Sequence, residues 1–577
     1  MANIRKTVDP IRLVTDRWSL ADAHHQQNLF KWSELNTMYK LGSLYNLNAR
    51  ADERGRKTHP DQAIARVSSS ILINAVKTIV PRLYGLFDPD GDWFNVVPQP
   101  MSRTTSQSST YVNNKLTAQL DEEAYGEIYT GLTQTAKFGK SVFKLRWLVQ
   151  DGKIYEDKPY MDVNSEGVPE IKWQRTSKNG VTFRGNKINL VPYWNFRIDP
   201  KSRTITGAEF TIEDIYMSVD ELRAIAESDD LGVFEMDKVK KLVKDMDEKY
   251  GGSDPRSDDD KEYYGYDSHR RDIKAYDYWE NERHFMIVNS PQGEQIQVLK
   301  KIDNPYWHQT KPYFDFSLEV DESTFYNQGA IEPLRDLHNI QSTALNQYLD
   351  ANTMNLRPMR LIDTDLEVDI KRLTHYIPND TIEVEGLAGR DIGKAIYEFK
   401  PELGSLLNAQ LMFMNQTDTQ AEKISGITEY ITGSAGIGSN RTASGAALLT
   451  QNAEQRGSAP VALIGLGGMR MLKLMHSNNQ QFSHPLEDLK GDYRFYVFGD
   501  ARSNQMMQTQ GLSMLAPLMI QAGADPKTVI KRLARAYKIP AVEELLPEDG
   551  TLEKNQATQM IQQAMAGQYD QGNQTPS

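Results

Sequence analysis

Apolar residues recur at helical spacing in two N-terminal segments, 19–49 and 61–86. In the first segment these positions fall on one side of an α-helix: Leu29, Phe30, Trp32, Leu35, Met38 and Tyr39. A polar helix is predicted from about Ser106 to Lys137, and "GKSVFKLRWLV" after it alternates as a strand does. The pattern therefore predicts a helix, a glycine and a strand, in that order, around Gly139.

The next part of the chain predicts strands. Residues 150–217 carry turn signals at "DGK", "NSEG" and "SKNG". Ser218 and Glu221 have the spacing of a capping box, so a helix is expected to begin there. Residues 251–272 combine Gly, Ser, Pro and an acidic run, which predicts an exposed, mobile loop. Strands return in "DIKAYDYWENERHFMIVN" and "EQIQVLKKIDNPYW".

Two long helices of similar length are predicted in the middle, over 329–355 and 401–425. Pro333 would lie in the first turn of one, and Pro401 would open the other. At 1.5 Å per residue the first would span about 40 Å. Residues 356–400 between them read as short strands and turns. The predicted shape is a hairpin of helices with a small β tip, whose sides must be covered by neighbouring chains.

A third long helix is predicted from Thr442 to Phe482. Gly457 and Pro460 interrupt its pattern at "RGSAP" and should kink it, because proline removes a backbone donor and clashes one turn back. Two or three further helices follow, and the tail "QYDQGNQTPS" is expected to be disordered.

Composition narrows the function classes. The chain has 577 residues, a net charge of -12 and no cysteine. Net acidity disfavours tight, static binding of nucleic acid, and the missing cysteine excludes disulfides, thiolate metal sites and cysteine nucleophiles. The N-terminus has no apolar signal region, and no apolar run reaches the length of a membrane span. We therefore expect a soluble protein made in the cytosol.

The most distinctive stretch is "ITGSAGIGSNRTASGAALLTQ", Ile431 to Gln451. It could cradle a phosphate, act as a lid or be a mobile tip. A phosphate-binding loop of the Walker A type needs lysine after its second glycine, but Gly438 is followed by Ser439 and Asn440. The glycines also lack the GxGxxG spacing, and a helix instead of a strand precedes them. A nucleotide site is therefore not indicated.

Other catalytic chemistry is not indicated either. There is no HExxH, and the adjacent His24 and His25 are expected on a polar helix face, so no metal site is predicted. No GxSxG occurs at a strand-to-helix turn. Acidic pairs at 363 and 365 and at 383 and 385 could be drawn as general acid and base, but solvated strand faces explain them better. We expect no enzyme and no cofactor.

Four stretches, in order, resemble the portal, or head-to-tail connector, proteins of tailed bacteriophages. They are "AKFGKSVFKLRW", "LVPYWNFRIDP" followed by "EDIYMSVDELRAI", "DNPYWHQTKPYFDFSLEVDESTFYNQGAIEPLRDLHNIQSTALNQYLD", and "ISGITEYITGSAGIGSNRTASGAALLTQNAEQRGSAP". They cover most of residues 60–480. The resemblance implies a predominantly helical α+β portal fold, assembled as a ring of usually twelve subunits.

The resemblance also implies a division of the chain. It assigns 1–328 to a wing, 329–355 and 401–425 to two stem helices, 356–400 to a small β clip and 426–442 to a tunnel loop. The remainder becomes a kinked wing helix with a return to the wing at 443–500, crown helices at 501–565 and a disordered tail at 566–577.

The resemblance further implies a function and partners. The ring would sit at one capsid vertex of the virion, at the head-tail junction, and pass double-stranded DNA during packaging and ejection. Its partners would be the major capsid protein, terminase and then tail adaptor or head-completion proteins, with no membrane. Two alternatives remain open: a nucleotide-dependent motor or DNA-processing enzyme with a divergent glycine loop, and a ring-forming tail component that passes no DNA.

Candidate site residues fall into three groups. The tunnel-loop group is Thr432, Gly433, Ser434, Gly436, Gly438, Ser439, Asn440 and Arg441. Its glycines let the chain turn, and its hydroxyl and amide side chains could touch DNA phosphates without holding them. Arg441 could sense the DNA backbone or form a salt bridge within the wing or to a neighbouring subunit. Those expected to face the stem lumen or a neighbouring subunit are Arg335, Asp336, Gln341, Gln347, Asp350 and Asn352. The clip residues expected to bind partners are Asp363, Asp365, Glu367, Glu383 and Glu385.

Overall fold

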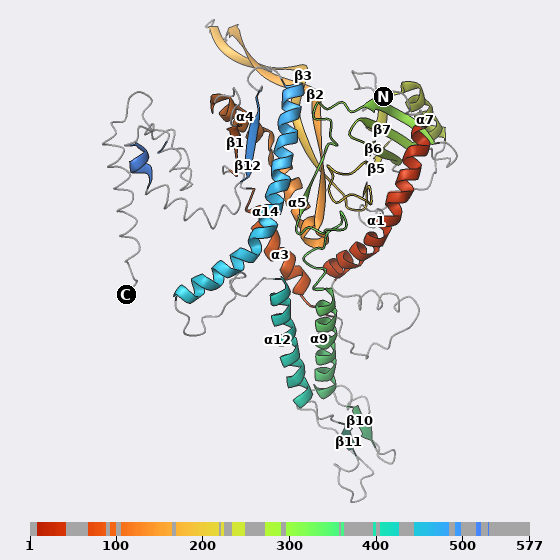
Figure 1. Ribbon diagram of the computed structural model, residues 1–577, viewed down its shortest axis with the longest axis vertical. Helices are drawn as coiled ribbons and strands as arrows, with labels where there is room; N and C mark the ends of the chain where they lie inside the picture. The colour runs from red at the N-terminus through yellow and green to blue at the C-terminus, as the bar shows by residue number, and fades with distance from the viewer. Residues whose placement is uncertain are drawn as a thin grey trace, which may run out of the picture. The chain divides into compact units, whose positions relative to one another are not determined.

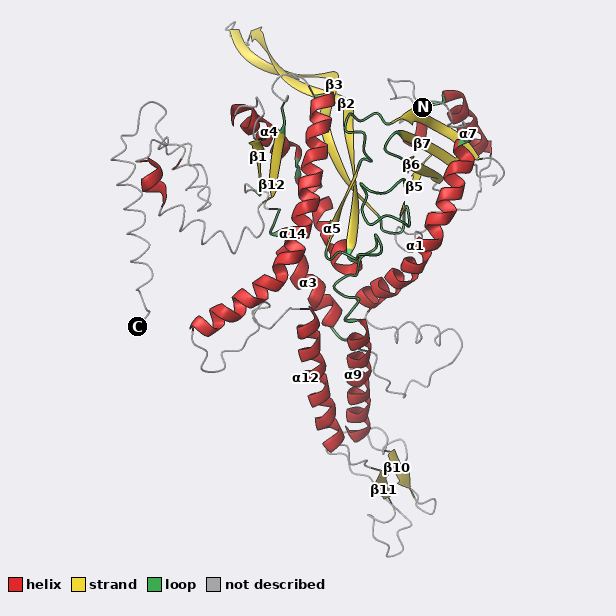
Figure 2. Ribbon diagram, viewed as in Figure 1, coloured by secondary structure: helices red, strands yellow, loops and turns green. Residues whose placement is uncertain are grey.

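The computed structural model describes the chain in sections. They are 9–41, 67–87, 93–99, 106–163, 169–218, 221–223, 234–248, 272–289, 296–356, 359–362, 396–399, 404–425, 443–483, 491–497, 515–520 and 529. Helices and strands are both well represented, so the predicted α+β class is confirmed (Figure 2). The chain forms two compact units: Met1–Asn28, Ile79–Gly329 and Glu454–Ser577 make the first, and Leu29–Thr78 with Ala330–Ala453 make the second (Figure 1).

In the first unit, a helix, a glycine and a strand follow one another as predicted. Helix α5 (Glu122–Phe138) ends at Gly139, whose φ of 84° is left-handed, and strand β2 (Lys140–Val163) begins at the next residue. The single helix expected over 106–137 is wrong, because it is two helices, α4 (Ser106–Gln119) and α5. Asp121 separates them: its side chain accepts a hydrogen bond from the Ala124 N–H and caps α5.

Strand β2 pairs with β3 (Pro169–Val191) in a long antiparallel hairpin that extends past the neighbouring strands (Figure 2). Only its first residues, Lys140–Lys144, also pair with β9 (Tyr313–Ser317). The turns expected at "DGK" and "SKNG" are wrong: both stretches are strand, and Gly152 lies opposite Gly180 next to a register shift after Gln150. Glycine within a short polar stretch is typical of a turn, but it also occurs inside strands. The sequence alone therefore does not distinguish two turns from two paired strand segments that each contain a glycine.

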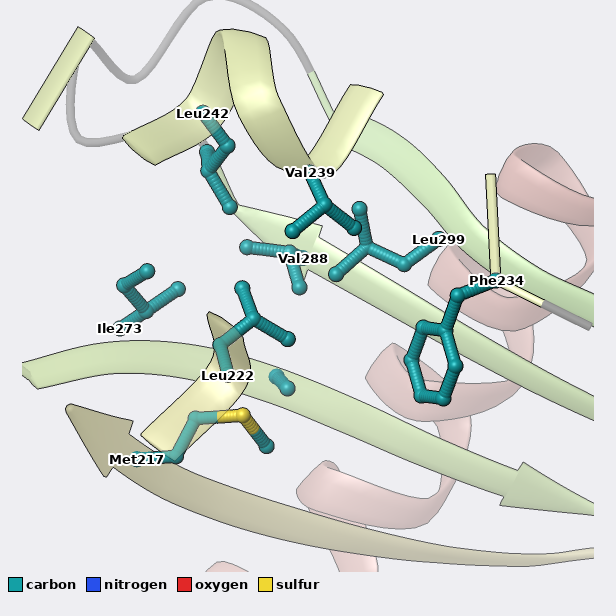
Figure 3. Close-up of a cluster of buried hydrophobic side chains, with 9 residues drawn as sticks. Met217, Leu222, Phe234, Val239, Leu242, Ile273, Val288 and Leu299 are labelled. Carbon is teal, nitrogen blue, oxygen red and sulfur yellow. The ribbon is translucent and has the colours of Figure 1, made fainter. Parts of the chain in front are cut away.

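A second sheet of this unit has five antiparallel strands. Its order is β4-β5-β6-β7-β8, with bounds Phe196–Ile198, Thr211–Ser218, Asp272–Trp279, Arg283–Asn289 and Ile296–Asp303. Helix α7 (Met236–Glu248) packs Val239 and Leu242 on one face of the sheet, over Val288 and Leu299 (Figure 3). Burial of these apolar side chains holds the helix to the sheet.

The capping box predicted after this sheet's second strand is confirmed. The Ser218 N–H donates to Glu221 Oε2 at 2.8 Å, and the Glu221 N–H donates to Ser218 Oγ at 3.1 Å. The predicted loop 251–272 lies outside the described residues except for Asp272, which begins β6.

A buried ionic network joins the two sheets. Lys144 on β2 donates to Glu213 on β5 at 2.6 Å and to Asp277 on β6 at 2.7 Å, and His284 lies 2.6 Å from the other oxygen of Asp277. Burial alone would lower the pKa of Lys144, but the two carboxylates raise it above its usual value. Such a cluster fixes how the sheets meet, because breaking one pair leaves a buried charge uncompensated.

Helix α1 (Pro10–Leu41) begins nine residues before the predicted position, where Asp9 Oδ1 accepts from the Ile11 N–H at 3.2 Å. The expectation that His24 and His25 lie on a polar face is wrong. His25 is 0% exposed, its Nε2 lies 2.9 Å from the Tyr193 carbonyl oxygen, and burial lowers its pKa to about 4. A neutral histidine can be buried when its ring finds a hydrogen-bond partner, so two adjacent histidines do not indicate the exposed side of a helix.

A further pair of strands joins two distant parts of the chain, and the sequence pattern does not predict this pairing. Strand β1 (Phe94–Pro98) pairs with β12 (Tyr493–Val497), almost four hundred residues later. Helix α14 (Ala443–Phe482) packs its C-terminal half on this pair, where His476 contacts the rings of Tyr493 and Phe495. Helix α3 (Ile71–Tyr84) is a shorter form of the helix predicted over 61–86.

The second unit contains the predicted pair of long helices, α9 (Arg335–Leu356) and α12 (Gly404–Ser425), which lie side by side (Figure 1). Strands β10 (Met359–Ile362) and β11 (Ile396–Phe399), which pair antiparallel, lie between them in the chain. α9 starts six residues later than predicted: Ile331 to Leu334 form tight turns first, with Leu334 and Arg335 N–H groups donating three residues back.

The third predicted helix agrees closely with α14, which continues through Gly457 and Pro460. The kink at those two residues stays a prediction. Of the predicted crown, the described part consists of 515–520 and 529, both helical, and the tail 566–577 lies outside the described residues.

Candidate functional site: the paired helices

A polar clasp, buried at Gln341 and Ser69 and exposed at Asp418, holds the two long helices together. Gln341 of α9 donates from Nε2 to Asp418 Oδ1 of α12 at 2.5 Å, and its Oε1 accepts from the Ser69 hydroxyl. Its side chain is only 7% exposed. The clasp therefore joins three pieces that are far apart in sequence, the segment before α3 and both long helices, and it explains why Gln341 needs a side chain that both donates and accepts.

The segment before α3 is fixed to α9 by two further side chains. Asn346 accepts from the Val67 N–H at 2.7 Å and donates to the Val67 carbonyl oxygen at 2.9 Å. Ser342 Oγ accepts from the Ser69 N–H at 3.0 Å. Asn346 thus satisfies both backbone groups of Val67, as a neighbouring strand would.

Away from the clasp, α9 presents one exposed row. We call it the α9 strip; its members recur at spacings of three and four, and it consists of Asp336, Ile340, Thr343 and Gln347. Ile340, in the middle of this row, is 46% exposed.

Helix α12 is exposed over most of its described length, and of its described side chains only Thr417 and Ala421 are buried. Its exposed side chains include Met412, Gln416, Thr419 and Lys423. Met412 is 73% exposed. Leu411 and Phe413 beside it are also exposed, so α12 carries several apolar side chains without cover from its own chain.

The six predicted stem residues divide accordingly. Asp336 and Gln347 are exposed, on the α9 strip, while Asp350 and Asn352 are half-buried. Arg335 Nη1 lies 3.6 Å from Glu34 of α1, and its Nε lies 3.2 Å from Asp336. For Gln341 the prediction is wrong, because its side chain is used up within the chain by the clasp.

Helical spacing could not reveal the clasp in advance. Ser69 and Asp418 lie far from Gln341 in sequence, and both read as ordinary polar helix positions. The predicted tunnel-loop residues 432–441 and the clip residues between 363 and 385 lie outside the described residues.

Within the described sections no group of three or more His, Cys, Asp or Glu side chains is arranged to hold a metal ion. In the same sections, no helix is both long enough and apolar enough to cross a membrane.

The sequence comparison decides the family. A family model described as the phage SU10 portal protein matches residues 116–490, more than half of the 577-residue chain. The chain belongs to this portal protein family. Among curated proteins, no sequence matches it. The portal match covers α5, the sheet of β2, β3 and β9, and the five-stranded sheet β4–β8. It also covers the paired helices α9 and α12, and α14. The resemblance to tailed-phage portal proteins is therefore confirmed, and with it the head-tail connector class.

Proposed function

We propose that this portal protein forms a ring of about twelve subunits around a DNA channel at one capsid vertex, through which DNA is packaged and ejected. The observation that carries the proposal is the family match, which runs continuously through both long helices and the segment between them. Paired helices that leave apolar side chains uncovered support assembly into a ring.

Within this proposal the ring is a conduit and not a motor. Force would come from a separate terminase that docks on residues 356–400, where Asp363, Asp365, Glu367, Glu383 and Glu385 would contact it, and tail adaptor proteins would later take its place. The major capsid protein would surround the wing in the virion. No cofactor is required.

The net charge of -12 suits a conduit. A lining rich in Lys and Arg would hold DNA through several phosphate contacts, each strongly salt-dependent, and would stop it from sliding. We propose that residues 426–442 form the narrowest point, where glycine, serine, threonine and asparagine touch phosphates weakly and Arg441 supplies one fixed charge per subunit.

Electron microscopy of the purified protein tests the proposal. Class averages viewed down a symmetry axis should show rings of about twelvefold symmetry with an open channel. Monomers at every salt and protein concentration tried, also in the presence of capsid protein, would refute it. ATP turnover by the purified protein, abolished by Gly436→Pro, would favour a motor instead.

A further inference from the structure

Arg470, on α14, is a partly buried cation without a direct partner. Within the described residues its guanidinium makes no hydrogen bond and no ion pair, and burial lowers its pKa. The carboxylate of Asp315 offsets part of this effect, but Asp315 is already paired with Lys140 at 3.3 Å. Arginine keeps its proton at physiological pH, so burying this charge costs free energy unless an anion joins it.

The position of Arg470 on α14 directs it toward the connection from β8 to β9, residues 304–312. Gly467, one turn earlier, touches the start of this region: a Cβ there would lie 2.4 Å from a backbone carbonyl oxygen of β9. Gln481 bonds to the connection itself, where its Oε1 accepts from the Trp307 N–H at 2.8 Å. Arg470 lies three residues after Gly467 and eleven before Gln481, so all three share one side of the helix.

His308 supplies a second donor in the same connection. Its Nδ1 accepts from the Thr310 N–H at 3.1 Å, and its ring stacks on Tyr306 with the centroids 5.0 Å apart. Burial, together with the nearby charge of Arg470, lowers the pKa of His308 to about 4, so the ring is neutral. The neutral ring therefore carries its proton on Nε2, which has no acceptor within the described residues.

The surrounding charges are positive in sum. Lys311 is 1% exposed, and its ammonium group donates to neutral oxygens, among them Asn281 Oδ1 at 3.0 Å. Burial and the charge of Arg470 lower the pKa of Lys311 to about 8, so it is still mostly charged at neutral pH. Lys140 and Asp315 cancel one another as a pair. Two positive charges, those of Arg470 and Lys311, are left without an adjacent carboxylate.

We propose that Arg470 and His308 bind a phosphate group between α14 and the β8–β9 connection. A phosphate carries about two negative charges and several acceptor oxygens, which match the two uncompensated cations, the guanidinium fork and the Nε2–H donor. A carboxylate, with one negative charge, would leave one cation uncompensated. The phosphate has two sources, free inorganic phosphate and the DNA backbone. The inference concerns a site on a single chain and does not depend on the proposed ring.

Calorimetric titration of the full-length protein with inorganic phosphate at constant ionic strength tests the site. Arg470→Gln should weaken binding by about tenfold to a hundredfold, since a charge-assisted bond is lost. His308→Asn keeps an acceptor for Thr310 but removes the Nε2–H donor, and it should weaken binding by about threefold to tenfold. Arg494→Gln, at an exposed position of β12, is the matched control and should change nothing. Equal binding by Arg470→Gln and wild type would overturn the proposal.

Thermal unfolding separates a ligand site from a structural role of Arg470. In chloride buffer, Arg470→Met should be at least as stable as wild type, because a partly buried charge is removed. Phosphate at the same ionic strength should raise the Tm of wild type by about 2 to 5 °C more than that of the variant. The general stabilisation by phosphate salts acts on both proteins and cancels in this comparison. A variant that is less stable in chloride and gains as much from phosphate would show a structural arginine and overturn the site.

Competition identifies the source of the phosphate. A short DNA duplex that displaces inorganic phosphate from wild type assigns the site to the DNA backbone. Phosphate binding that the duplex leaves unchanged assigns it to free phosphate, and both results support the site. Acetate that displaces phosphate at equal concentration would assign the site to a carboxylate and overturn the proposal.

Discussion

At the scale of single residues, the buried histidine His476 lowers the stability of the folded protein at acidic pH. His476 is buried between α14 and β12, and within the described part of the chain neither ring nitrogen has a hydrogen-bond partner. Burial lowers its pKa from 6.5 to about 4. The imidazole is therefore neutral in the folded protein at neutral pH and resists charging on acidification.

The pH dependence of stability follows from that shift. Between about pH 6.5 and pH 4 the unfolded chain binds a proton at His476 that the folded chain does not, so the free energy of unfolding falls as pH falls. His476→Phe should remove this contribution, making the variant more stable relative to wild type at pH 5 than at pH 8 by about 1 to 2 kcal/mol. Urea unfolding at both pH values measures it, and an equal difference at the two would contradict the assignment.

At the scale of elements, the end of α5 and the chain before α9 are locked together by close backbone packing. A Cβ on Gly329 would lie 2.1 Å from the Lys137 carbonyl oxygen, and one on Gly139 would lie 2.5 Å from the Gln328 carbonyl oxygen. Neither neighbour is a flexible side chain that could move aside. The two glycines therefore set where the chain leaves the first unit for α9.

Gly329→Ala should lower the free energy of unfolding of the first unit by about 2 to 4 kcal/mol, because backbone must shift to admit the methyl group. Gly126→Ala, within α5, is the control: a Cβ there meets nothing within 4 Å. It should raise stability by about 0.5 to 1 kcal/mol through helix propensity. Thermal or urea unfolding of both variants against wild type gives the comparison, and equal effects would refute the lock.

Elements with strong local signals were predictable from sequence. The capping box at Ser218 and the order of α5, Gly139 and β2 depend on neighbouring residues alone. β12 was missed because a short strand is stabilised by a partner almost four hundred residues away, and the α4–α5 break was missed because one aspartate decides it. Lumen or intersubunit contact of Asp336 and Gln347 stays a prediction, whereas burial of Gln341 depends on partners that periodicity does not contain.

At the scale of the whole molecule, the proposed function separates assembly from DNA contact. The helices α9 and α12 would hold the ring, and residues 426–442 would meet the DNA. A change confined to the loop should then alter DNA handling and leave the ring alone.

Deletion of 433–439 should leave ring formation unchanged in electron micrographs and reduce packaged or retained DNA per particle. Replacing the same residues with a glycine-serine segment of equal length is the control for chain length. Loss of rings on deletion would mean that the loop is structural. Cross-linking of packaged DNA to 430–441 would distinguish a DNA conduit from a tail component that passes none.

The two strands of the β2–β3 hairpin should separate more easily at the outer end of the hairpin than near Lys144. Near Lys144 the two strands share a sheet with β9 and its buried rings, whereas around Tyr155 and Trp173, which are 64% and 67% exposed, each strand has only the other. Opening the outer part exposes almost no core, so it costs little free energy. Backbone amides of 153–158 should therefore exchange with deuterium well before those of 141–145. Slow exchange over the outer part in assembled rings would mean that another protein surface covers it.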